Sequence, residues 1–135
     1  MPKVVVDTNI LISATVFGGV SDDILELARG REIELLTSPV ILEEFSRILR
    51  VKVSFSPERI IEALLEIRGI VTLVNPKIKL SVVKEDEPDN RILECAISAK
   101  ADFIISGDTK HLQPLKEYEG IKILSPSEFL RLQKY

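Results

Sequence analysis

The sequence predicts an α/β fold in which a mostly parallel central sheet of about five strands is flanked by helices. Short apolar runs rich in Val, Ile and Leu alternate with segments of helical periodicity, an order typical of parallel strands joined by crossover helices. Several runs are apolar at nearly every position, as expected for strands covered on both faces. Serine–proline pairs mark the beginnings of segments between these runs, and this pair is typical of a helix N-terminus.

The predicted strands are short apolar segments, of which the first contains the run Val4-Val5-Val6. In chain order they are Lys3–Val6, Ile33–Thr37, Ile70–Val74, Phe103–Ser106 and Ile121–Leu124. In open parallel sheets ligands bind beyond the carboxyl ends of the strands. We therefore expect functional side chains where these strands end and at the helix starts that face them.

The predicted helices begin and end at recognisable residues. Ser38, Ser56 and Ser125 each precede a proline, Ser125 and Glu128 have the spacing of a capping box, and glycines follow two of the helices. In chain order the helices are Ser21–Arg29, Pro39–Arg50, Pro57–Arg68, Pro88–Lys100 and one that begins at Pro126. The segment Val16–Val20 is interpreted as an apolar loop.

Composition narrows the class of protein. A chain of 135 residues with 45% hydrophobic residues is expected to form one domain over residues 1–135. Cys95 has no partner for a disulfide.

The sequence contains no clear membrane or signal segment. The longest run without charge, Thr8 to Ser21, is shorter than the about 18 residues of a membrane helix, and Asp7 interrupts any apolar region of a signal peptide. We expect a cytoplasmic protein without membrane association, whose net charge of −3 gives no general attraction to nucleic acid.

Four carboxylates occupy positions where the sheet would bring them together. Asp7 directly follows the first strand, and Asp108 follows the fourth through Gly107. Glu44 borders the apolar stripe of its helix, and Asp89 is in the first turn of the next. Each alone has an ordinary interpretation as a helix cap, a first-turn acid or a surface group. Their common placement favours a shared site.

Carboxylates crowded into one site repel one another and raise each other's pKa unless cations neutralise them. Mg²⁺ or Mn²⁺ prefers such oxygen ligands. Ions of this kind activate water and stabilise the leaving oxygen in reactions of phosphates. The sequence therefore favours a divalent-metal site that acts on a phosphate ester.

The order and spacing of four motifs resemble those of the PIN-domain nucleases, in particular the bacterial and archaeal toxin components of toxin–antitoxin pairs. The resemblance covers nearly the whole chain. The motifs are Val4-Val5-Val6-Asp7-Thr8-Asn9, Ser38 six residues before Glu44, Asp86-Glu-Pro-Asp89-Asn90, and Ser106-Gly107-Asp108.

The resemblance implies an endoribonuclease that cleaves single-stranded RNA with Mg²⁺ or Mn²⁺. The implied metal-binding and catalytic residues are Asp7, Glu44, Asp89 and Asp108. The implied supporting residues are Thr8 and Asn9, which brace Asp7, Ser106 as a hydroxyl at the site, and Asp86 as a peripheral acid. The implied partners are RNA, a cognate antitoxin that blocks the acidic site through a basic side chain, and a second copy in a homodimer.

Three alternatives stay open at this point. A phosphatase of the haloacid dehalogenase type needs an acid two residues after Asp7, where this chain has Asn9, and a response-regulator receiver needs an aspartate where it has Asn75-Pro76. A PIN-fold RNA-binding or regulatory subunit with little or no nuclease activity is the stronger alternative. Basic side chains that could contact phosphates, and whose ordinary interpretation is solvated surface, are Arg47, Arg50, Lys52 and Lys110.

Overall fold

The chain forms a six-stranded sheet in the order β3-β2-β1-β4-β6-β5. The structure is a computed structural model that describes residues 1–80, 87–108 and 112–133. The strands are β1 (Lys3–Val6), β2 (Glu34–Thr37), β3 (Val71–Leu73), β4 (Phe103–Ile105), β5 (Glu117–Tyr118) and β6 (Ile121–Leu124). All neighbours pair in parallel except β5, which is antiparallel to β6. The predicted fold class is confirmed.

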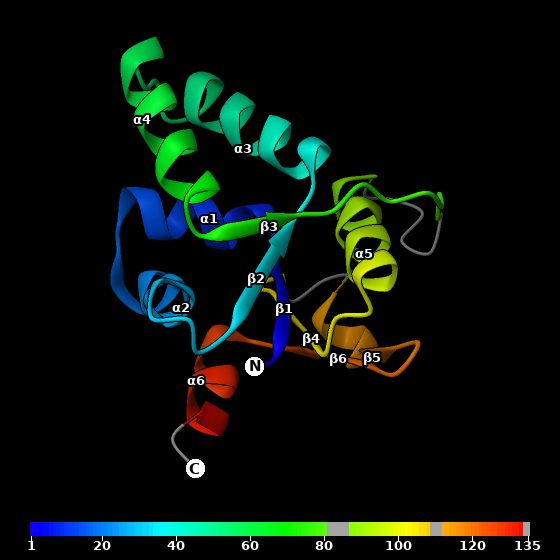
Figure 1. Ribbon diagram of the computed structural model, residues 1–135. Helices are drawn as coiled ribbons and strands as arrows, with labels where there is room; N and C mark the ends of the chain where they lie inside the picture. Colours follow the sequence, from blue (N-terminus) through cyan, green and yellow to red (C-terminus); the bar gives the residue numbers. More distant parts are fainter. Residues whose placement is uncertain (81–86, 109–111, 134–135) are drawn as a thin grey trace.

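Helices cover both faces of the sheet (Figure 1). They are α1 (Thr8–Val16), α2 (Gly19–Arg29), α3 (Pro39–Val51), α4 (Pro57–Arg68), α5 (Glu87–Ala99) and α6 (Pro126–Gln133), with a short 3-10 helix at Gln113–Leu115. Figure 1 shows α5 on one side of the sheet and α2 and α6 on the other, while α3 and α4 lie at the end toward which β1 and β2 run. Helix α3 contacts both α1 and α5. It therefore closes the carboxyl edge of the sheet.

Each of the five predicted strands is present within one residue at either end, and the predicted helix caps form. Ser38 accepts from the backbone N–H of Ile41 at 3.4 Å, and Ser56 from that of Arg59 at 3.2 Å. Ser125 and Glu128 make both hydrogen bonds of the capping box, at 2.9 and 3.2 Å. These local signals were sufficient to position the helices because each cap satisfies backbone groups that the first turn leaves unpaired.

The segment after Asp7 differs from the prediction, because it forms the helix α1. Asp7 is its N-cap and accepts from Ile10 N–H at 3.0 Å. The prediction of a loop over Val16–Val20 was wrong, since Val16 ends α1 and α2 begins at Gly19. Gly18 and Gly19 have φ values of 74° and 62°, which glycine adopts at little cost, so they join the two helices in a tight turn.

The hydrophobic core lies on both faces of β1. Val4, Val5 and Val6 are at most 1% exposed, as expected for a central strand covered by helices on both sides. The polar residues that follow β1 therefore lie at the edge of this buried core.

No helix among the described residues is both long and apolar enough to cross a membrane.

Candidate functional site

Asp7 is fixed at the carboxyl end of β1 by bonds to its backbone and its side chain. Its N–H donates to the carbonyl oxygen of Ile105 at 3.0 Å, which continues the pairing of β1 with β4. One carboxylate oxygen accepts from Ile10 N–H, and the other accepts from the hydroxyl of Ser106. The residue is 4% exposed. Parallel strand pairing thus explains why Asp7 and Ser106, far apart in the chain, are in contact.

Ser106 connects Asp7 to Asp108. Its fully buried hydroxyl donates to Asp7 and accepts from the backbone N–H of Asp108 at 2.9 Å. Gln113 anchors this turn by donating its side-chain amide to the Ser106 carbonyl oxygen at 2.7 Å. The turn after β4 therefore holds the fourth predicted acid beside the first.

Burial raises the pKa of Asp7 to about 6, and the Asp108 carboxylate adds a smaller effect in the same direction. The hydrogen bonds from Ser106 and Ile10 oppose this rise in pKa because they favour the charged form. Desolvation outweighs them. A bound cation would relieve this cost, since it would restore the electrostatic stabilisation that the carboxylate loses on leaving water.

Three of the four predicted acids line one cavity of about 140 Å³ at the carboxyl edge of the sheet. Asp7 comes from the start of α1, Glu44 from α3 and Asp89 from the first turn of α5. They meet because α3 packs against both α1 and α5. The lining residues are Asp7, Thr8, Asn9, Glu44, Ile48, Lys52, Pro88, Asp89 and Ile92. Asp108 is outside this lining and approaches the cavity through Ser106.

The donor set of this cavity fits a hard divalent cation, since carboxylate oxygens are the ligands that Mg²⁺ and Mn²⁺ prefer. The side chains are not closed around one point. Glu44 accepts from Arg47 at 3.3 Å, and residues 1–80, 87–108 and 112–133 contain no group of three or more His, Cys, Asp or Glu arranged to hold a metal ion. Glu44 lines the cavity while one of its carboxylate oxygens accepts from Arg47, so a bound cation would compete with Arg47 for this acid.

The supporting residues occupy different places in the site. Thr8 is buried and Asn9 exposed, and both line the cavity from the first turn of α1. Ser106 contacts Asp7 directly. Asp86 lies outside the described residues, as does the basic candidate Lys110.

Lys52, one of the basic candidates, is exposed at the end of α3 and also lines the acidic cavity. Its place in this lining has a signal in the sequence. Lys52 follows Glu44 by eight residues and Ile48 by four, and this spacing puts all three on one side of a helix.

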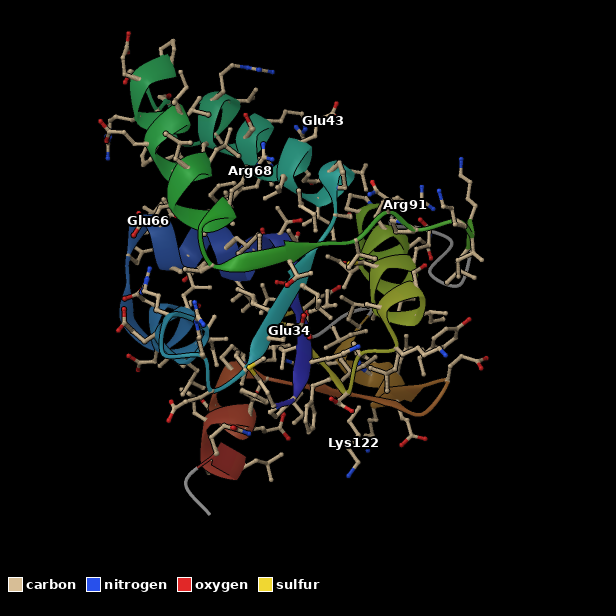
Figure 2. All side chains as sticks on the ribbon, viewed as in Figure 1. Glu34, Glu43, Glu66, Arg68, Arg91 and Lys122 are labelled. Carbon is tan, nitrogen blue, oxygen red and sulfur yellow. The ribbon has the colours of Figure 1, made fainter. Side chains whose placement is uncertain are left out.

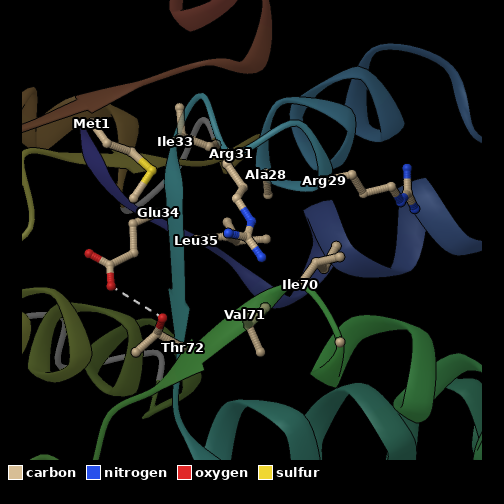
Figure 3. A pocket seen from close by; sticks show the side chains of 11 residues that line it. Met1, Ala28, Arg29, Arg31, Ile33, Glu34, Leu35, Ile70, Val71 and Thr72 are labelled. Atoms are coloured by element: carbon tan, nitrogen blue, oxygen red, sulfur yellow. Dashed lines mark hydrogen bonds between the residues drawn. The ribbon is translucent and has the colours of Figure 1, made fainter.

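A second pocket, of about 440 Å³, lies at the opposite edge of the sheet, where β2 and β3 begin. Arg31, Glu34, Val71 and Thr72 are among its lining residues. Figure 3 shows the Glu34 carboxylate accepting from the Thr72 hydroxyl across the two strands, at 3.2 Å. This pocket lies at the amino ends of the strands. Glu34 is the one acid among its described lining residues and is already bonded to Thr72, so the pocket lacks the grouped carboxylates of the first.

Comparison with known proteins gives consistent results. A family model described as PIN domain matches residues 3–110. The protein MJ1680 of Methanocaldococcus jannaschii is 34% identical over 142 aligned residues, which cover 95% of this chain and 89% of that protein.

Solved structures share the fold at low sequence identity. One is the structure of VapBC2 from Rickettsia felis bound to a DNA fragment from its promoter. It has a TM-score of 0.66 and 18% identity, and the match covers 90% of this chain and 96% of that chain. PAE2754 from Pyrobaculum aerophilum has a TM-score of 0.64 and 14% identity, covering 99% and 91%. VapBC-1 from nontypeable Haemophilus influenzae has a TM-score of 0.63 and 17% identity, covering 93% and 98%.

Proposed function

The chain belongs to the PIN-domain family, and from that premise we propose that it is a Mg²⁺- or Mn²⁺-dependent endoribonuclease that cleaves single-stranded RNA in the cytoplasm. One observation carries the proposal. Asp7, Glu44 and Asp89 belong to three different helices or helix caps and line the same cavity. A fold gains nothing in stability by grouping carboxylates around a cavity, so their grouping favours a role in binding cations.

Each acid has a distinct part in the proposed site. Asp7, Glu44 and Asp89 would hold the cation, and Asp108 would support it from beside Asp7. When bound, the metal supplies activation of water and stabilisation of the charge that develops on the phosphate. Ser106 and Ile10 fix the orientation of the Asp7 carboxylate, so that it need not reorganise during the reaction. The proposed cleavage leaves a 5′-phosphate.

The direct test is cleavage of a pool of single-stranded RNAs with Mn²⁺, with EDTA, and by the variants Asp7→Asn and Asp89→Asn. We expect cleavage with Mn²⁺ and its loss in the other three conditions. Asp23→Asn is the matched control, since Asp23 is exposed on α2 and outside the cavity lining. Cleavage that persists after chelation and in both cavity variants would contradict the proposal.

The second candidate function is an RNA-binding or regulatory subunit with little or no nuclease activity. The hydrogen bond from Arg47 to Glu44 favours it, because Arg47 would compete with a metal for this carboxylate. Calorimetric titration with Mn²⁺ and a cleavage assay on the same sample separate the two functions. Metal binding without cleavage supports the subunit, whereas binding with cleavage supports the nuclease.

We also propose a small antitoxin as partner, on the basis of the fold shared with VapBC2 and VapBC-1. The acidic cavity is complementary to a basic side chain, which would compete with the metal for the same carboxylates. A short open reading frame beside the gene is the expected source. Co-expression of its product should abolish cleavage, and unchanged cleavage by the purified complex would contradict this role.

A second copy of the chain is the other proposed partner, and the groove between α3 and α4 is its proposed interface. The groove has a volume of about 580 Å³, and Leu42, Ile61, Leu64 and Leu65 contribute apolar side chains to it. Glu43 and Arg68 also line it, one from each helix (Figure 2). A two-fold axis brings the same patch of both copies together, so that Glu43 of each copy can approach Arg68 of the other.

A further inference from the structure

Lys52 is the only basic side chain among the described residues that line the acidic cavity. It is the C-cap of α3, and its N–H donates to the carbonyl oxygen of Ile48 at 2.9 Å. Three carboxylates line the same cavity. The cavity lining therefore contains one basic side chain beside three acidic ones.

The position of Lys52 follows from the geometry of α3. Glu44, Ile48 and Lys52 are spaced four residues apart and all line the cavity. At 1.5 Å per residue, Lys52 begins about 12 Å from Glu44 along the helix axis. Helical side chains lean toward the N-terminus, so the exposed Lys52 side chain can extend back along this row. Lys52 therefore adds a positive charge to the lining of the cavity.

Arg47 and Lys52 differ in their partners. Arg47 is bonded to Glu44 at 3.3 Å. Lys52 makes no ion pair with any described residue, although it shares the cavity with three acids. Its ammonium group therefore neither neutralises Glu44 nor holds another acid in place, and it is available to an anionic group that enters the cavity.

We propose that Lys52 binds a phosphate of the single-stranded RNA, next to the phosphate that is cleaved; this inference rests on the proposed nuclease function. The chain carries a net charge of −3, so RNA gains no general electrostatic attraction. A cation in the lining of the acidic cavity offsets the local repulsion and sets the position of the strand, because phosphate contacts determine register rather than sequence.

The test is binding of a fluorescein-labelled single-stranded RNA, measured by fluorescence anisotropy in EDTA over a series of salt concentrations. For single strands each phosphate contact contributes a slope of about −0.7 in log K against log[salt], or about fivefold in affinity at 0.1 M salt. Lys52→Gln should make the slope shallower by about 0.7 and weaken RNA binding about fivefold. Lys52→Arg should retain both, because it keeps the charge.

Lys122→Gln is the matched control, since Lys122 is exposed on β6 and lies at the end of the molecule opposite α3 (Figure 2). It should bind RNA as the wild type does. In the cleavage assay Lys52→Gln should raise KM about fivefold and leave kcat unchanged, as expected for a contact made equally in the ground and transition states. An unchanged salt slope in Lys52→Gln overturns the proposal.

Titration with Mn²⁺ distinguishes RNA binding from a structural role. Removing a positive charge should leave Mn²⁺ affinity equal or higher, so weaker Mn²⁺ binding by Lys52→Gln would show that Lys52 organises the acids, and would overturn the proposal. The nuclease proposal fails separately: wild-type protein that binds RNA through Lys52 but does not cleave it contradicts the nuclease function and leaves the Lys52 contact standing.

Discussion

Asp7 serves the fold and the candidate site with the same carboxylate. As the N-cap of α1 it satisfies the N–H of Ile10, and as a partner of Ser106 it connects β1 to the turn after β4. Both contacts stabilise the charged form, yet burial raises the pKa to about 6. When Asp7 is ionised and no cation is bound, its burial therefore lowers the free energy of unfolding. Such a conflict between stability and function is typical of functional sites.

This conflict predicts how stability depends on pH in the metal-free protein. The folded state holds the Asp7 proton more tightly than the unfolded state, whose pKa is near 3.8. The contribution of Asp7 to folding therefore falls as the pH rises from about 4 to about 6 and is constant above that range. Above pH 6 the cost is about 2–3 kcal/mol, at 1.36 kcal/mol per pKa unit.

Urea unfolding of the wild type and Asp7→Asn in EDTA, at pH 4 and pH 7.5, measures this effect. Because the other acids titrate in both proteins, the difference between the two free energies isolates Asp7. Asp7→Asn should gain about 2–3 kcal/mol relative to the wild type between the two pH values. The charge of Asp108 contributes to the raised pKa of Asp7, so its effect is part of this difference, whereas titrations that do not depend on Asp7 cancel. A difference that is the same at both pH values would contradict the assigned pKa.

Ser106→Ala should impair both the geometry and the charge of the site. It removes the donor to Asp7 and the acceptor for Asp108 N–H, and a hydrogen bond to a charged group contributes about 1.5–3 kcal/mol. We expect kcat/KM for RNA cleavage to fall about 10- to 100-fold. Ser98→Ala, an exposed position on α5, is the control and should retain full activity. Equal activity in the two variants would exclude an organising role for Ser106.

Cys95 should be chemically inert in the folded protein. It is fully buried on α5, and burial raises the pKa of its thiol to about 12. Only the thiolate reacts with disulfide reagents, so Ellman's reagent at pH 8 should label no thiol in native protein and one in denaturant. Rapid labelling of the native protein would show that α5 opens locally.

At the scale of elements, sequence prediction succeeded where the signal is local. Ser38 and Ser56 precede prolines and cap α3 and α4 as predicted. The sequence did not predict helix α1, because its apolar residues are not confined to one face and the periodicity that identifies a surface helix is weak. This apolar distribution fits a helix that packs against both α2 and α3. Strand β5 has two residues, and its pairing with β6 has no distinct pattern in the sequence.

Helix α5 is anchored to the segment before it by a buried acid. Glu94, 5% exposed, accepts from the backbone N–H of Leu80 and from Arg91, both at 2.6 Å, and Arg91 also donates to the Leu80 carbonyl oxygen at 3.2 Å. These contacts fix the start of α5, which carries Asp89.

Glu94→Gln should therefore destabilise the protein by about 2 kcal/mol, because a charge-assisted network is weakened inside the fold. We expect Mn²⁺ affinity to fall as well, since Asp89 would be held less firmly. Urea unfolding and calorimetric titration measure the two effects. Glu62→Gln, on an exposed part of α4, should change neither. A Glu94→Gln protein of unchanged stability would show that the network contributes little.

At the scale of the whole molecule, the sequence predicted which acids share an edge of the sheet, because parallel strands all end there. Asp7, Glu44 and Asp89 line one cavity as expected, while Asp108 is connected through Ser106. The sequence did not predict the position of Lys52 in the cavity. That position depends on how α3 packs across α1 and α5, and helix packing is decided by side-chain contacts distant in the chain.

The surface of the whole molecule carries the last prediction, which concerns the groove between α3 and α4. Leu65 is 67% and Ile61 57% exposed beside this groove, and a second copy that covered them would remove apolar area from water. We expect sedimentation equilibrium to show a wild-type dimer and a Leu65→Glu monomer, because each copy would bury an unpaired charge in an apolar interface. Leu132→Glu makes the same change at a half-exposed position on α6 and should leave the dimer intact. A wild-type monomer, or a Leu65→Glu dimer, would exclude this face as the interface between copies.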